Sequence, residues 1–94
     1  MRIIFLASTT QDSQWFRFYY KTVFPQGSLR ASKHMQTTLN VLKATPFIGA
    51  VGGEESVREI QITRTPFALQ YRVTKTHIEI IRIRDQRRDE KKSD

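Results

Sequence analysis

The most constraining feature of this sequence is an alternation of apolar and polar residues along 67–74. Every second position carries a large apolar side chain, at Phe67, Leu69, Tyr71 and Val73. Because successive side chains of a β-strand point to opposite faces of the sheet, this segment is predicted to be a strand with one buried face. Shorter runs of the same kind at 57–62 and 77–84 predict a strand on either side of it.

The connection between the second and third of these strands sets their register. A two-residue loop at 75–76 places Arg72 opposite Glu79 and puts Tyr71 on the same face as Ile80. A slip of one residue would set Arg72 beside the isoleucines of the third strand, so side-chain parity favours this register. The Lys-Thr pair is not a favoured two-residue turn, which leaves a four-residue loop of equal parity open.

Helical spacing of apolar residues predicts two helices in the first half of the chain. The first is predicted to begin with Thr9 as N-cap and Asp12 in the first turn, and to end at Pro25. Its apolar positions are Trp15, Phe16, Tyr19, Tyr20 and Val23. The second is predicted to begin with Ser28 as N-cap and to end before Pro46. Its apolar stripe is Ala31, Met35, Thr38, Leu39 and Leu42.

Two segments complete the predicted order. The apolar run at 2–7 predicts an N-terminal strand, and the glycine-containing segment 45–56 predicts a loop pinned by Phe47 and Ile48. The fold class is therefore α+β with the order β-α-α-β-β-β. We expect the N-terminal strand and the helical hairpin to pack on one face of a small, mostly antiparallel sheet, whose other face is exposed and carries Arg72.

A single domain is expected over 1–88, followed by a flexible, charged tail at 89–94. Ile81 and Ile83 lie on the opposite parity from Ile80, which indicates a strand covered on both faces or an apolar patch for a partner. The residues predicted to form the core are Trp15, Tyr19, Leu39, Leu42, Ile60, Phe67, Leu69, Tyr71 and Ile80.

Charge and composition bound the function. The formal net charge is +7 and the isoelectric point is about 10.3, so an anionic partner is expected. The absence of cysteine excludes disulfides and cysteine-based zinc or nucleophile chemistry. The apolar run at 2–7 is too short to span a bilayer, so we expect a soluble, cytoplasmic protein without a membrane segment.

Several polar residues have both a chemical and a structural interpretation. His77 is expected to be a solvated turn residue away from the arginines, and His34 a surface residue; neither has a second ligand at metal-binding spacing, so no metal site is expected. Glu59 is interpreted as a cross-strand ion pair with Arg72 rather than a general base. Tyr71 is expected to have a buried ring and a satisfied hydroxyl.

The arginines are the strongest candidates for binding. Seven of ten lie within 57–88, and the planar guanidinium suits specific recognition of anions and carboxylates. The predicted target-binding residues are Arg72, Arg82, Arg84, Arg87 and Arg88.

The second half of the chain resembles the RelE/ParE superfamily of bacterial toxins from type II toxin–antitoxin pairs. The similarity lies in a VREI strand at 57–60, the TPFALQYRV strand at 65–73 and the segment IEIIRIRDQRR at 78–88. RelE-like nucleases carry an arginine where this chain has Phe67, and place a tyrosine or histidine after the last strand, where this chain has none after Ile83. The resemblance is therefore to the ParE-like branch.

This resemblance implies a toxin that inhibits DNA gyrase by protein–protein binding, without catalytic residues or a cofactor. It also implies a cognate antitoxin, whose acidic, partly disordered segment folds along the helical hairpin and the sheet in a hetero-oligomer. The alternative is a ribosome-dependent mRNA endonuclease that uses Arg72, Arg82 and Arg84 electrostatically. An inactive homologue or a simple nucleic-acid-binding module is a third possibility.

Overall fold

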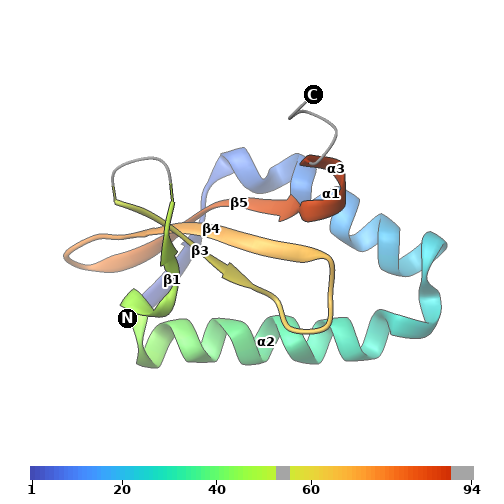
Figure 1. Ribbon diagram of the computed structural model, residues 1–94, viewed down its shortest axis with the longest axis horizontal. Coiled ribbons are helices and arrows are strands. Elements are labelled where there is room, and N and C mark those ends of the chain that lie inside the picture. The colour runs from blue at the N-terminus through green and yellow to red at the C-terminus, as the bar shows by residue number, and fades with distance from the viewer. Residues whose placement is uncertain (53–55, 90–94) are drawn as a thin grey trace.

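Five strands form one mixed sheet in the order β1-β5-β4-β3-β2 (Figure 1). The computed structural model describes residues 1–52 and 56–89. The central antiparallel strands are β3 (Val57–Gln61), β4 (Phe67–Val73) and β5 (His77–Asp85). The edge strand β1 (Arg2–Phe5) runs parallel to β5, and β2 (Ala50–Val51) runs antiparallel to β3. The predicted α+β class is confirmed; β2 was missed because two residues are too few to show a period.

Two long helices precede the central strands. Helix α1 (Thr10–Phe18) continues as a π-helical turn at Tyr19–Val23, and α2 (Ser28–Ala44) follows a short turn at Pro25–Gly27. Figure 1 shows α2 running along the sheet and α1 beside the end of β5. A short helix, α3 (Gln86–Asp89), follows β5 and contains the first residue of the predicted tail; residues 90–94 lie outside the described part of the chain.

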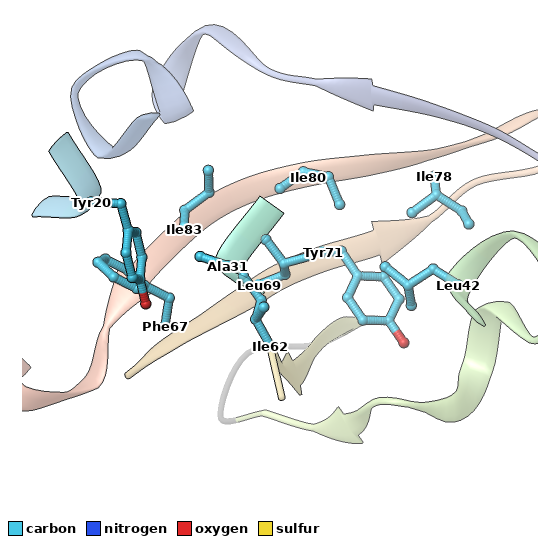
Figure 2. Packing of buried hydrophobic residues seen from close by; sticks show 10 residues of the cluster. All are labelled: Tyr20, Ala31, Leu42, Ile62, Phe67, Leu69, Tyr71, Ile78, Ile80 and Ile83. Carbon is cyan, nitrogen blue, oxygen red and sulfur yellow. The ribbon is translucent and has the colours of Figure 1, made fainter. Parts of the chain in front are cut away.

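The core lies between α2, the π-helical turn and the sheet face that carries Phe67, Leu69 and Tyr71 (Figure 2). Five predicted core residues are fully buried: Leu42, Phe67, Leu69, Tyr71 and Ile80. The other four are partly buried around them: Trp15, Tyr19, Leu39 and Ile60. Fully burying one such side chain contributes about 1.5–3 kcal/mol, so this cluster is the main source of stability.

The predicted register is confirmed, because Arg72 pairs with Glu79 and Tyr71 with Ile80. The Thr74 N–H donates to the His77 carbonyl at 2.8 Å, which confirms a two-residue loop at 75–76. The prediction for Ile83 was wrong. A β-bulge between Gln70 and Tyr71 shifts the register, so that Ile81 has no partner and Ile83 pairs with Leu69 in the core. One extra residue reverses the parity of everything after it.

Side chains from the N-terminal segment cover the edge of β5 where β1 ends. Strand β1 pairs with β5 only as far as Ile80. Beyond that point the Ser8 hydroxyl donates to the Ile81 carbonyl at 2.7 Å, and Asp12 accepts the Ile83 backbone N–H at 3.0 Å. Because buried or partly buried backbone groups need partners, these two contacts continue the ladder of an otherwise open edge.

One predicted N-cap position is confirmed and the other is wrong. The N-cap of α1 is Thr9, as predicted, but its hydroxyl donates to Leu6 and no side chain caps the helix. The Asp12 carboxylate instead accepts the Ile83 backbone N–H at the edge of β5. Helix α2 has Gly27 in the N-cap position, so Ser28 is already its first residue.

The segment after α2 is fixed by Tyr71. The Tyr71 hydroxyl donates to the Pro46 carbonyl and accepts the Gly49 N–H, both at 2.8 Å. The Phe47 and Ile48 side chains are 63% and 52% exposed, so the prediction that they pin this loop was wrong. A Cβ on Gly49 would lie 2.5 Å from the Tyr71 hydroxyl oxygen, which explains a glycine at this position.

Candidate functional site

The sheet face opposite α2 carries most of the predicted binding arginines. We call it the outer face and define it by Glu59, Gln70, Arg72, Arg82 and Arg84, from β3, β4 and β5. It contains a hollow of about 500 Å³ lined by Gly52, Val57, Arg58, Glu59, Gln70, Arg72, Ile81 and Arg82. The bulge at Ile81 is what places Arg82 and Arg84 on this face, since without it their parity would direct them towards the core.

Glu59 lies at the centre of the outer face. Its carboxylate accepts hydrogen bonds from Arg84 Nη2 at 2.6 Å, from Arg84 Nε at 3.0 Å and from Gln70 at 3.2 Å. The prediction that Glu59 pairs with Arg72 was wrong, because the register sets Val57 opposite Arg72 and Glu59 opposite Gln70. Glu59 therefore links β3 to β5 across β4.

Arg72 belongs to a second network at the β4–β5 turn. It contacts Glu79 at 3.3 Å, and the other carboxylate oxygen of Glu79 lies 3.0 Å from His77 Nε2. The hydrogen bond with His77 lowers the pKa of Glu79 most; burial opposes this, and Arg72 lowers the pKa further. The His77 Nδ1 atom lies within hydrogen-bond distance of the Thr74 and Thr76 hydroxyls. His77 is thus held next to the Arg72–Glu79 ion pair, and the prediction of a solvated residue away from the arginines was wrong.

Arg82 reaches from β5 to the first turn of α1. Its Nε and Nη2 atoms contact the two carboxylate oxygens of Asp12 at 2.7 and 3.1 Å. This fork-like geometry is the strong arrangement for an arginine–carboxylate pair. The Arg82 side chain remains half-exposed, so it is held in place and still accessible.

Arg87 and Arg88 do not join the outer face. They extend from α3 over aromatic side chains of α1 and of the π-helical turn. The Arg87 guanidinium lies 4.5 Å from the Tyr19 ring centre, and the Arg88 guanidinium lies 5.0 Å from that of Trp15. Contacts of this kind between a cation and an aromatic face contribute about 0.5–1 kcal/mol at exposed sites. The predicted arginine set therefore divides into two separate groups.

Asp85 organises this second group and was missed by the sequence analysis. Its side chain is buried and accepts the Trp15 indole N–H at 2.9 Å, the Arg87 backbone N–H at 3.1 Å and two Arg87 guanidinium contacts at 3.0 and 3.1 Å. Burial raises the pKa of Asp85, but the hydrogen bonds from Arg87 and Trp15 outweigh it and the net shift is downward. The available signal was its spacing from Arg87, which is that of a helix N-cap.

Most of the predicted binding arginines are held in ion pairs within the chain. Arg72, Arg82, Arg84 and Arg87 each pair with a carboxylate of the same chain. Among the described residues, no group of three His, Asp or Glu side chains could hold a metal ion. In that same part of the chain, no helix has the length and apolar character needed to cross a membrane.

Comparison with known proteins identifies the fold. Neither the models of protein families nor the curated proteins give a match. Among solved structures, a chain of the "Chromosomal ParDE TA system from P. aeruginosa" matches with a TM-score of 0.70 at 23% sequence identity; the match covers 90% of this chain and 95% of that chain. The chain therefore has a ParE-like fold, as the resemblance of its sequence predicts.

Proposed function

We propose that this protein is the toxin of a type II toxin–antitoxin pair, that it inhibits DNA gyrase by direct binding, and that a cognate antitoxin neutralises it. The observation that carries the proposal is the ParE-like fold over nearly the whole chain. Because a fold can host several functions, the target must be argued from the surface.

The charges of the outer face favour a protein target. Arg72, Arg82 and Arg84 are interleaved with the carboxylates of Glu79, Asp12 and Glu59. A protein gains affinity for a nucleic-acid backbone from cations that no carboxylate neutralises. The carboxylates of this face would repel the phosphates. A protein partner can match both signs, and arginines held in a fixed geometry are frequent energetic centres of protein interfaces.

The test is gyrase supercoiling with purified toxin, free of antitoxin. We expect inhibition by the wild-type protein. We also expect at least a tenfold weaker effect for Arg72→Gln, because removing a central interface arginine typically costs about 2 kcal/mol or more. Lys33→Gln, an exposed cation on α2, is the matched control and should inhibit normally. If folded wild-type protein in molar excess leaves supercoiling unchanged, gyrase is not the target.

The antitoxin is tested separately. We expect the product of the adjacent gene to co-purify with the toxin and to abolish its effect on growth. Failure of the two proteins to associate would contradict the pairing, whatever the outcome with gyrase.

One observation favours the alternative, a ribosome-dependent mRNA endonuclease. RNA cleavage without a metal needs a group that takes up a proton and charge stabilisation of the phosphate, and His77, Glu79 and Arg72 form a contiguous set of this kind. Primer extension on translated mRNA distinguishes the two functions. If His77→Gln abolishes mRNA cleavage that the wild-type protein supports, the endonuclease assignment replaces the gyrase assignment.

A further inference from the structure

A second concave region lies at the turn between the two long helices. We call it the hairpin pocket; it encloses about 520 Å³ and is lined by Tyr20, Phe24, Gln26, Gly27, Arg30, Ala31 and Arg64. It shares no lining residue with the hollow of the outer face. Its lining residues come from the helical turn, from α2 and from the β3–β4 connection, which extends towards α2 in Figure 1. The gyrase assignment, which is argued from the outer face, makes no use of this pocket.

Aromatic side chains form one wall of the hairpin pocket. The ring centres of Tyr20 and Phe24 lie 6.4 Å apart; Tyr20 is buried, whereas Phe24 is 47% exposed. A Cβ on Gly27 would overlap the Phe24 ring, so the glycine allows the ring to lie against the turn. The wall thus offers a half-exposed aromatic face in a fixed position.

Two arginines from different elements supply the charge. Arg30 lies in the first turn of α2 and Arg64 in the β3–β4 turn. Within residues 1–52 and 56–89, neither arginine side chain forms a hydrogen bond or ion pair, and no acidic residue lines the pocket. This differs from the arginines of the outer face, which are compensated by carboxylates.

Arg64 is held in an unfavourable backbone conformation. Its φ is +61°, in the left-handed region where glycine or asparagine is preferred. The turn around it is rigid, because Thr65 N–H donates to the Ile62 carbonyl at 3.1 Å and the Gln61 side chain donates to the Thr65 carbonyl at 2.6 Å. The Arg64 side chain is exposed and lines the pocket. Strained residues of this kind occur preferentially at ligand sites.

We propose that the hairpin pocket binds a phosphorylated aromatic ligand, either a free nucleoside monophosphate or the terminal nucleotide of a nucleic-acid strand. The Phe24 ring provides a stacking face for the base, and Gln26 provides an amide for its polar edge. The two guanidinium groups bind the phosphate, whose oxygens offer more acceptors than a carboxylate does. The volume is in the range of small-molecule sites, roughly 300–1,000 Å³.

Titration calorimetry on the full chain tests this proposal, with 5′-AMP, adenosine, inorganic phosphate and an eight-residue glutamate peptide as probes. We expect 5′-AMP to bind at least tenfold more tightly than adenosine or phosphate alone. Single-stranded octamers with and without a 5′-phosphate separate the two sources. Tighter binding of the phosphorylated octamer than of 5′-AMP assigns the site to nucleic-acid ends, and equal or weaker binding assigns it to free nucleotides.

Arg64→Gly is the decisive variant, because glycine accepts the φ of +61° and the variant should fold at least as stably as the wild type. We expect it to lose 5′-AMP binding by tenfold or more, whereas Lys33→Gln should bind normally. Equal affinity in Arg64→Gly, equal affinity for adenosine and 5′-AMP, tighter binding of the glutamate peptide, or no binding of 5′-AMP at millimolar concentration overturns the proposal.

Discussion

Asp85→Asn tests whether a buried carboxylate joins α3 and α1 to the sheet. Asparagine has nearly the same shape, but it carries no charge and presents an NH₂ group where a carboxylate oxygen accepts Arg87 or Trp15. Hydrogen bonds to a charged group are worth about 1.5–3 kcal/mol. Because Arg87 is 48% exposed and regains water when it is released, we expect a loss near the lower end, about 2 kcal/mol.

Thermal unfolding followed by the fluorescence of Trp15, the only tryptophan, measures this loss next to the altered group. For a domain of this size, each kcal/mol lowers Tm by roughly 4–8 °C, so the variant should unfold roughly 8–16 °C below the wild type. Arg88→Gln is the control; it removes only an exposed contact with the Trp15 ring and should cost about 1 kcal/mol or less.

The effect of Asp85 should also depend on pH. The pKa of its carboxyl is lowered in the folded state, so its stabilisation is present above the unfolded pKa of about 4 and is lost as pH falls through the folded value. The difference in stability between wild type and Asp85→Asn should therefore narrow below about pH 4. A difference smaller than about 0.5 kcal/mol at pH 7, the size of an ordinary surface substitution, would refute the role of Asp85 as a structural centre.

Three further predictions concern Tyr71 and Glu79. Tyr71→Phe leaves the Gly49 N–H without its partner and should lower the free energy of unfolding in urea by about 1–3 kcal/mol; an unchanged midpoint would contradict the anchoring role. Gly49→Ala should cost about 1–3 kcal/mol in the same assay through overlap with the Tyr71 hydroxyl, and a neutral effect would show that the loop moves freely. His77→Gln should raise the pKa of Glu79, measured by NMR titration of its carboxyl, because that pKa is lowered chiefly by the hydrogen bond with His77; an unchanged titration would count against the network. In the wild type, the contribution of Glu79 to stability is present above its unfolded pKa and is lost as pH falls through the lowered value.

Local alternation predicted much of the central sheet. Phe67, Leu69 and Tyr71 lie on the buried face, and the Arg72–Glu79 pairing follows from the period of two and a short loop. The bulge could not be predicted from the adjacent isoleucines, because either face of a strand accepts an isoleucine. Strand β2 depends on pairing with β3 rather than on any pattern of its own.

The partners of the arginines were harder to predict because they depend on contacts between distant segments. Glu59 meets Arg84 rather than Arg72 because of the β3–β4 register and the bulge in β5. Asp85 was not predicted as a site residue, although its side chain is buried. Its indole donor, Trp15, is 70 residues away in the sequence and becomes a neighbour only in the folded chain. Residue type alone does not distinguish an exposed carboxylate from a buried one that is fully hydrogen-bonded.

The measurement that tests the gyrase assignment most directly is the accumulation of gyrase–DNA cleavage complexes with the purified, folded toxin. We predict that linear DNA is trapped in proportion to the toxin added, that Arg72→Gln traps at least tenfold less, and that Lys33→Gln traps as much as the wild type. Unchanged cleavage complexes at a molar excess of toxin, together with codon-dependent cleavage of translated mRNA by the same preparation, would contradict the proposed function.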